Sequence, residues 1–239
     1  METLKVKNIS HSFDDTKILN NINFSVNQGE IKSILGQSGC GKTTLLHICA
    51  NLLKQTSGDI NNTFSKFSFV FQEPRLLPWQ NVIENIILPL KDSDIPKQKQ
   101  REMAKNIAYQ LGLKEIDLTK YPKDLSGGMK QKVSFARALI IKPKLLFLDE
   151  PFGALDVTLK NELYSFLLEK VKNDNLSILF ITHDLIESIT LSDEIIILKP
   201  FDSGSKITNI INFDKSQDKR DDKFIFEYLV KLNKTIKED

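Results

Sequence analysis

The stretch IKSILGQSGCGKTT, residues 31–44, joins a short apolar run to a glycine-rich loop and to the start of a helix. Its loop, from Gly36 to Thr43, fits the pattern GxxxxGK[ST]. In that pattern the glycines let successive backbone N–H groups point at phosphate oxygens, and the following helix N-terminus adds a favourable dipole. The helix is expected from the spacing of Leu45, Ile48, Cys49, Leu52 and Leu53. The order of strand, loop and helix therefore predicts a phosphate-binding loop.

Within this loop the side chains of Lys42 and Thr43 suit the same ligand. We expect Lys42 to neutralise phosphate charge and the Thr43 hydroxyl to bind Mg²⁺. The other loop positions expected to contact a nucleotide are Gly36, Gln37, Ser38, Gly39, Cys40, Gly41 and Thr44. Because backbone amides and Lys42 surround Cys40, we also expect a lowered pKa and a reactive thiol there. A chance glycine turn is the alternative, and the position between strand and helix argues against it.

Composition excludes several other classes of protein. The chain has 239 residues, is 41% hydrophobic and is long enough for a substantial core. Basic and acidic residues number 33 and 31, and no long run of like charge suggests a nucleic-acid footprint. The two cysteines lack metal-ligand spacing, and the N-terminus lacks an apolar signal region. The longest apolar runs fall short of a membrane span, so we expect a cytosolic protein whose membrane role, if any, is peripheral.

A core of parallel strands is predicted from short apolar runs that alternate with helical patterns. The runs are IKSIL (31–35), FSFVF (67–71), LLFLD (145–149), ILFIT (178–182) and EIIIL (194–198). Strands that alternate with helices favour an α/β fold with a parallel sheet. Ahead of them, two segments with alternating apolar residues, Leu4 to Val6 and Ile22 to Val26, predict a small antiparallel sheet.

The domain organisation follows from where this alternation stops. Residues 73–141 are helix-rich and contain no convincing strand, which predicts an inserted helical subdomain. We expect a single domain whose core comes from residues 1–72 and 142–199. Residues 200–239 are then a polar C-terminal extension with a helix in KFIFEYLVKLNK.

An acidic pair stands at the end of one predicted core strand. In LLFLDE the apolar residues indicate a buried strand, and Asp149 and Glu150 follow at its carboxyl end, where open α/β sheets place ligands. Asp149 would anchor the Mg²⁺ shell and Glu150 would polarise an attacking water. Such a pair seen alone is as often a solvated or helix-capping feature. The phosphate-binding loop upstream favours the functional interpretation.

Two adjacent glycines open another predicted helix, in LSGGMKQKVSFARAL, residues 125–139. Each glycine costs a helix interior about 1 kcal/mol relative to alanine. A helix N-terminus presents unpaired N–H groups, and glycine lets a ligand approach that backbone closely. The pair at Gly127 and Gly128 therefore predicts a second place that meets an anion.

Taken in order, these motifs resemble those of ATP-binding cassette (ABC) ATPases, which have a P-loop NTPase fold. The matching elements are the loop at 36–43, Gln72, LSGGM at 125–129, LLFLDE at 145–150, Ala154-Leu155-Asp156 and His183. Met129 departs from the glutamine most frequent in that family. The resemblance implies ATP hydrolysis with Mg²⁺ and a dimer in which each LSGGM faces the phosphate loop of the other subunit.

The resemblance also implies roles for individual residues. Glu150, His183 and Lys42 would be catalytic, and Thr43, Gln72 and Asp149 would hold the metal. Phe13 would stack on adenine, although a core aromatic is the alternative for that residue. The remaining residues expected at the nucleotide are Gln72, Ser126, Gly127, Gly128 and Asp156.

The stretch EPRLLPWQNVIENI after Gln72 resembles importers of the nitrate, sulfonate and taurine type. It implies that the surface from Gln72 to Trp79 docks a membrane permease, although Trp79 would alternatively pack inside the helical subdomain. The partners implied are a second cassette, that permease and, indirectly, an extracytoplasmic substrate-binding protein, at the cytoplasmic face of the membrane. A soluble ABC ATPase, such as an iron–sulfur assembly scaffold, and an exporter or lipoprotein-release ATPase remain alternatives.

Overall fold

The computed structural model describes residues 1–153, 155–213 and 215–237, with side chains described as far as residue 234. The chain forms two compact units. Unit 1 consists of residues 1–64 and 177–239, and unit 2 consists of residues 65–176. The phosphate loop and His183 therefore belong to a different unit from Gln72, Glu150 and the glycine pair.

Unit 1 contains an antiparallel sheet of three strands. These are β1 (Thr3–Phe13), β2 (Thr16–Asn27) and β4 (Ser57–Asn62), in the order β2-β1-β4. Asp14, in the left-handed conformation at φ 49°, makes the tight turn between β1 and β2. The two predicted strands are confirmed. The sequence missed β4 because SGDINN is polar and lacks the apolar alternation of a half-buried strand.

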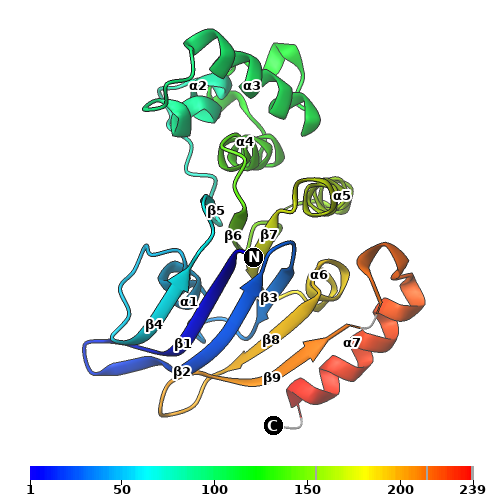
Figure 1. Ribbon diagram of the computed structural model, residues 1–239. Helices are drawn as coiled ribbons and strands as arrows, with labels where there is room; N and C mark the ends of the chain where they lie inside the picture. Colours follow the sequence, from blue (N-terminus) through cyan, green and yellow to red (C-terminus); the bar gives the residue numbers. More distant parts are fainter. Residues whose placement is uncertain (154, 214, 238–239) are drawn as a thin grey trace. The chain divides into compact units, whose positions relative to one another are not determined.

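The core strands of unit 1 surround β3, the strand that leads into the phosphate loop. Strand β3 (Ile31–Leu35) pairs in parallel with β7 (Ser177–Thr182) and with β8 (Glu194–Lys199), as Figure 1 shows. All residues of β3 and β7 are buried, as expected for a parallel sheet covered on both faces. The antiparallel strand β9 (Lys206–Asn212) adds to β8 and was missed within the polar C-terminal segment.

The described part of unit 1 contains the α-helices α1 (Lys42–Cys49), α6 (Leu185–Leu191) and α7 (Asp222–Lys237), and a short 3-10 turn at Gln217–Lys219. The first is shorter than its apolar spacing predicted, and Leu52 lies beyond it, 54% exposed. The helix ends because Asn51 adopts the left-handed conformation at φ 56°, while the Leu52 amide donates to the carbonyl of His47. The predicted C-terminal helix is confirmed as α7, which buries Leu232 completely in a cluster with Leu35 and Ile197.

Unit 2 combines two parallel strands with four helices. Strand β5 (Phe67–Val70) pairs with β6 (Leu145–Asp149). The helices are α2 (Val82–Ile87), α3 (Lys97–Gln110), α4 (Gly127–Leu139) and α5 (Val157–Asp174), and short 3-10 turns lie at Leu88–Leu90, Glu115–Asp117 and Pro122–Asp124. Between β5 and β6 the described chain is helical, as predicted. Figure 1 labels these elements.

The interior of unit 2 is built around aromatic rings that fix α4 and α5. The rings of Phe135 and Phe152 stack with centroids 6.1 Å apart, and Phe152 meets Tyr164 edge-on at 4.9 Å. Phe152 is fully buried two residues after Glu150. The chain that follows β6 is therefore anchored close to its acidic pair. The fold class is the predicted one, α/β with mostly parallel core strands, an antiparallel N-terminal sheet and a helical segment.

Candidate functional site

The phosphate loop is shaped by contacts within unit 1. A Cβ atom added to Gly36 would lie 2.4 Å from the carbonyl oxygen of Leu198, and one added to Gly41 would lie 2.7 Å from Ile18 Cγ2. Gly41 also has φ 90°, a conformation that favours glycine. These two glycines are therefore required by the loop itself, before any ligand is considered.

The loop already holds its lysine in place. Lys42 is 4% exposed, and its Nζ donates hydrogen bonds of 2.9 Å to the carbonyl oxygens of Gly36 and Gln37. The first hydrogen bond of the α1 ladder runs from Leu45 N to Gly41 O. Helix α1 begins at Lys42, directly after Gly41, so the helix N-terminus and its favourable dipole lie at the loop and suit an anion. Among the remaining loop residues Ser38, Gly39 and Thr43 are exposed.

The structure corrects the expectation for Cys40. Its side chain is 3% exposed and points into the loop, where its Sγ would lie 2.7 Å from a Cβ on Gly36. Burial raises the pKa of the Cys40 thiol, and the nearby Lys42 charge offsets this only in part. We predicted a lowered pKa because sequence proximity to Lys42 was visible and burial was not. Cys49 is buried as well, and burial raises the pKa of its thiol strongly.

His183 lies at the same edge of the core strands as the phosphate loop. Leu35, which precedes Gly36, pairs with Thr182, which precedes His183. The residues around His183 are held by hydrogen bonds: Thr182 Oγ1 donates to Glu187 Oε2 at 2.6 Å, and the Asp184 amide donates to Thr182 Oγ1 at 3.0 Å. Gly36, Gln37 and His183 line a common cavity of about 410 Å³. The structure thus brings the predicted histidine to the loop.

Phe13 occupies the end of β1 and is 48% exposed. Its ring meets that of His11 edge-on at 4.6 Å, and His11 is itself only 6% exposed. The alternative that Phe13 is a core aromatic is therefore wrong, because about half of the side chain faces solvent. One face of the residue remains available for stacking.

In unit 2 the acidic pair ends β6 in an unusual conformation. Asp149 is 5% exposed, and Glu150 follows with φ 41°. The left-handed region costs a residue with a Cβ roughly 1–2 kcal/mol, and such strain is concentrated at functional sites. Aromatic packing of Phe152 and a hydrogen bond of 2.9 Å from buried Gln131 Nε2 to the Pro151 carbonyl hold this segment.

Two residues of α4 that sequence reasoning missed hold the segments around the predicted site. Besides Gln131, Arg137 donates hydrogen bonds of 2.6 and 2.9 Å to the carbonyl oxygens of Pro74 and Arg75. Exposed Gln72 lies just ahead of these carbonyls. Burial lowers the pKa of the Arg137 guanidinium, so the two carbonyls replace part of its hydration. The sequence signal that could have found these two residues is that Gln131 and Arg137 are polar residues within a helix that is otherwise rich in apolar residues.

The glycine pair opens α4, as predicted, but the two glycines differ. Ser126 caps the helix, its Oγ accepting from the Met129 amide at 3.2 Å. A Cβ on Gly128 would lie 2.5 Å from Leu159 Cδ2, whereas one on Gly127 would meet nothing within 4 Å. Gly128 therefore has a packing reason inside unit 2. Gly127 has none among the described residues.

Two further expectations concern exposed positions of unit 2. Asp156 caps α5, its carboxylate accepting from the Leu159 amide at 2.9 Å, and Ala154 of the same motif lies outside the described residues. Trp79 is 70% exposed, so the alternative that it packs inside the helical segment is wrong. Within the described ranges no helix is long and apolar enough to cross a membrane. The same ranges hold no cluster of three or more His, Cys, Asp or Glu side chains placed to bind a metal.

Comparisons with known proteins identify the family. Residues 19–153 match the family described as ABC transporter. An aliphatic sulfonates import ATP-binding protein, SsuB, of Corynebacterium glutamicum is 37% identical over 95% of this chain and 91% of its own length. A second such protein, from Shouchella clausii, is 40% identical over 82% of this chain and 77% of its own length.

Solved structures show the same relationship. The dimeric structure of MJ0796, a bacterial ABC transporter cassette, has a TM-score of 0.80 and 29% identity, with 89% of this chain and 100% of that chain covered. A post-hydrolysis structure of the same cassette, bound to ADP and Pi, has a TM-score of 0.80, 28% identity and the same coverage. The chain described here therefore belongs to the ATP-binding cassette transporter family, in which it is an ATP-binding ATPase subunit.

Proposed function

We propose that the chain carries two half-sites, one at the phosphate loop and one at the start of α4, and that two copies of the chain complete the ATP sites. The loop amides and Lys42 would bind the phosphates, Phe13 would stack on the adenine, and His183 would contact the terminal phosphate. Ser126 and Gly127 at the start of α4, and Asp156 at the start of α5, would serve the ATP held by the partner copy. The open space at Gly127 is the single observation that carries this proposal, because no described residue of its own unit explains that glycine.

Hydrolysis would depend on Glu150, which polarises the water that attacks the terminal phosphate. The strain at φ 41° supports this assignment, because backbone strain of this kind is concentrated at functional sites. His183 would orient the same water. The hydrogen bonds around Thr182 and Asp184 keep that imidazole at the strand end rather than leaving it on a free loop.

The donor set fits Mg²⁺. The ligands would be the Thr43 hydroxyl, the Gln72 side chain and the Asp149 carboxylate, all oxygen donors of the kind that this ion prefers. When bound, Mg²⁺ offsets phosphate charge. The carboxylate of Asp149 is 5% exposed and would gain from a cation partner in such a buried place.

We further propose that the ATPase drives import of a small molecule through a membrane permease. Exposed Trp79, with half-buried Leu76 and Leu77, gives an apolar surface beside Gln72 for a permease segment. Two relatives are named for aliphatic sulfonate import, which supports cargo of the nitrate, sulfonate and taurine type. The chain would then act peripherally at the cytoplasmic face of the membrane, with an extracytoplasmic binding protein selecting the cargo.

The experiment is affinity purification of a Glu150→Gln form from detergent-solubilised membranes with ATP present, followed by mass spectrometry. Loss of the general base should trap the ATP-bound dimer on its permease. One multi-span membrane protein should co-purify, and a Glu150→Gln, Trp79→Ser form should lose it while still binding ATP. Repeated recovery of soluble partners alone would overturn the permease assignment in favour of a soluble ABC ATPase, and the hydrolysis proposal would stand separately.

A further inference from the structure

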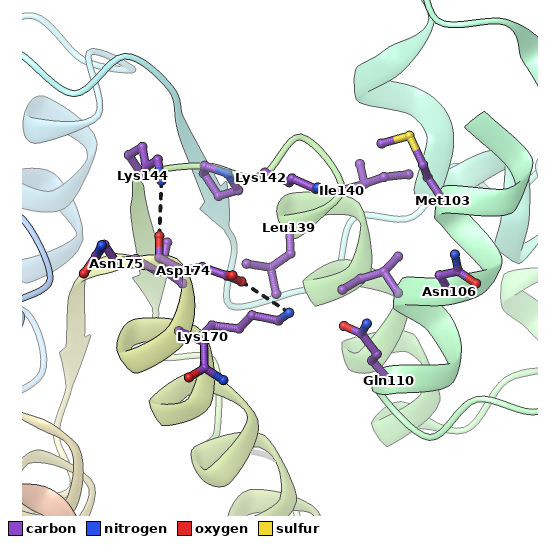
Figure 2. Close-up of a pocket in the computed structure, with 14 residues that line it drawn as sticks. Met103, Asn106, Gln110, Leu139, Ile140, Lys142, Lys144, Lys170, Asp174 and Asn175 are labelled. Carbon is purple, nitrogen blue, oxygen red and sulfur yellow. Dashed lines mark hydrogen bonds and ion pairs between the residues drawn. The ribbon is translucent and has the colours of Figure 1, made fainter. Parts of the chain in front are cut away.

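Unit 2 contains an open cavity of about 620 Å³ that none of the proposed ATP-site residues lines. Its walls come from α3, the end of α4, the chain leading to β6, and the end of α5 (Figure 2). The volume is within the range of about 300–1,000 Å³ typical of small-molecule pockets. The cavity therefore has the size of a ligand site.

The charged side chains of this cavity are mainly cationic. Lys142, Lys144 and Lys170 line it together with one carboxylate, Asp174. Lys144 Nζ donates to the backbone oxygen of Asp174 at 3.2 Å, and Lys170 Nζ lies 3.4 Å from its Oδ2, the two dashed contacts of Figure 2. The ammonium group of Lys142 is exposed and has no ion partner among the described residues. Positive charge is thus in excess.

The ends of two helices account for some of the positive charge of the cavity, but not for Lys142. Helices α4 and α5 both end at the cavity, and cations near a helix C-terminus are stabilised by its dipole. The contact of Lys144 with the Asp174 carbonyl is of that kind. Lys142 makes no such side-chain contact with the described residues, although its backbone adopts the left-handed conformation at φ 51°. The Lys142 ammonium is therefore the charged group of this cavity that makes no side-chain contact with the described residues.

The polar part of the wall also offers hydrogen-bond donors. Side-chain amides line the cavity from α3 and from the end of α5, and none hydrogen-bonds to the described part of the chain: Asn106, Gln110, Asn173 and Asn175. Amide and ammonium groups together match the oxygens of a carboxylate or a sulfonate.

The remaining wall is hydrocarbon. Met103 and Ile107 of α3 are half-buried here, and Leu139 and Ile140 of α4 are 6% and 3% exposed. Figure 2 shows Met103 and Asn106 on α3 and the lysines on the chain segments that face it. A hydrated inorganic ion would leave this apolar surface unused, whereas a ligand with a short hydrocarbon body would bury it.

From these contacts we infer that the cavity is a binding site for a small organic anion with a hydrocarbon body, such as an aliphatic sulfonate or carboxylate. The anionic group would lie at Lys142, and the body would lie on Met103 and Ile107. The inference is independent of the proposed ATP site, because the two share no residue.

Isothermal titration calorimetry of the full chain without nucleotide tests the inference directly. Hexane-1-sulfonate is the probe, sulfate supplies the charge without the hydrocarbon, and hexyltrimethylammonium supplies the hydrocarbon with the opposite charge. We expect saturable binding of hexane-1-sulfonate. Its affinity should fall between low salt and 0.15 M salt, because at that salt concentration charges are screened over a distance of about 8 Å. Sulfate and the ammonium compound should bind much more weakly.

Variants then locate the site. Lys142→Met should weaken hexane-1-sulfonate binding about tenfold, as expected for the loss of one charged hydrogen bond, and Lys142→Arg should restore most of it. Lys172→Met is the matched control, because Lys172 is an exposed lysine of α5 that does not line the cavity. All three variants should melt at the temperature of the unmodified chain, since both lysines are exposed.

Three results would overturn the inference. The first is that hexane-1-sulfonate shows no saturable binding. The second is that sulfate binds with equal affinity, which would indicate an inorganic-ion site only. The third is that Lys142→Met and Lys172→Met weaken binding equally. Loss of ATPase activity in other variants would not bear on it, because the titration contains no nucleotide.

Discussion

The two helix N-termini that open on glycine, at α1 and α4, differ in what their own unit requires of them. At α1 the space beside Gly36 and Gly41 is filled by Leu198 and Ile18, so these two glycines are explained inside unit 1. At α4 the space beside Gly127 is open. Gly127, unlike Gly36, Gly41 and Gly128, therefore has no internal cause among the described residues. An open glycine at a capped helix start points to a surface that another molecule covers.

Complementation between two inactive variants would give the largest effect. Lys42→Ala should remove phosphate binding, and Gly127→Asp should place a negative charge where the partner's ATP is expected. Neither homodimer should hydrolyse ATP. An equal mixture should recover about a quarter of the unmodified rate, because half of the dimers are mixed and each mixed dimer keeps one intact site. The rate is measured as phosphate release.

If the mixture stays inactive while both variants fold and associate, the two half-sites do not belong to different copies. Association is checked by light scattering with ATP. Gly127→Asp is expected to fold, because an acidic residue in the first turn of a helix is favourable.

Alanine at each glycine would separate internal from external causes. Gly36→Ala should lower the free energy of unfolding by about 1–3 kcal/mol, because its Cβ would overlap the Leu198 carbonyl. Gly127→Ala should change that free energy by less than about 0.5 kcal/mol, since nothing surrounds the new methyl group. Urea unfolding followed by circular dichroism measures both. Equal destabilisation would remove the contrast between the two helices.

Removing the contacts of α4 with the chain after Gln72 should have a smaller effect on the ATPase rate. Arg137→Met should lower the ATPase rate on the order of tenfold and leave ATP affinity unchanged, because the Pro74 and Arg75 carbonyls lose their donor and Gln72 is held less firmly. Lys130→Met, on the same helix, is the control. A change in ATP affinity as large as the change in rate would show that Arg137 does more than position this segment.

Alkylation of Cys40 should show the smallest effect at neutral pH. Its raised pKa means that less thiolate is present at pH 7 than for an ordinary cysteine, and the labelling rate should rise with pH until the raised pKa is passed. Peptide mapping after maleimide treatment at several pH values follows the reaction. Labelling of Cys40 at pH 7 faster than that of a free thiol would contradict the burial argument.

Local sequence patterns were sufficient to predict the strands that consist of one continuous, buried apolar run. Strand β3 was predicted with its observed ends, and β6 likewise, because each is a fully buried strand. The polar strands β4 and β9 were missed because their pairing, and not their composition, makes them strands. The apolar spacing predicted a longer α1 than the structure has. The helix ends because of the left-handed backbone conformation of Asn51, which the spacing does not reveal.

Sequence alone determined the family and the order of its motifs, because the glycine spacing of a phosphate loop and the acidic end of an apolar strand are local consequences of the chemistry. Tertiary structure decided what depends on neighbours distant in the chain. The burial that raises the Cys40 pKa, the carbonyls held by Arg137 and the open space at Gly127 are of this kind. Burial and contact are set by segments that meet only after folding, so no local pattern contains them.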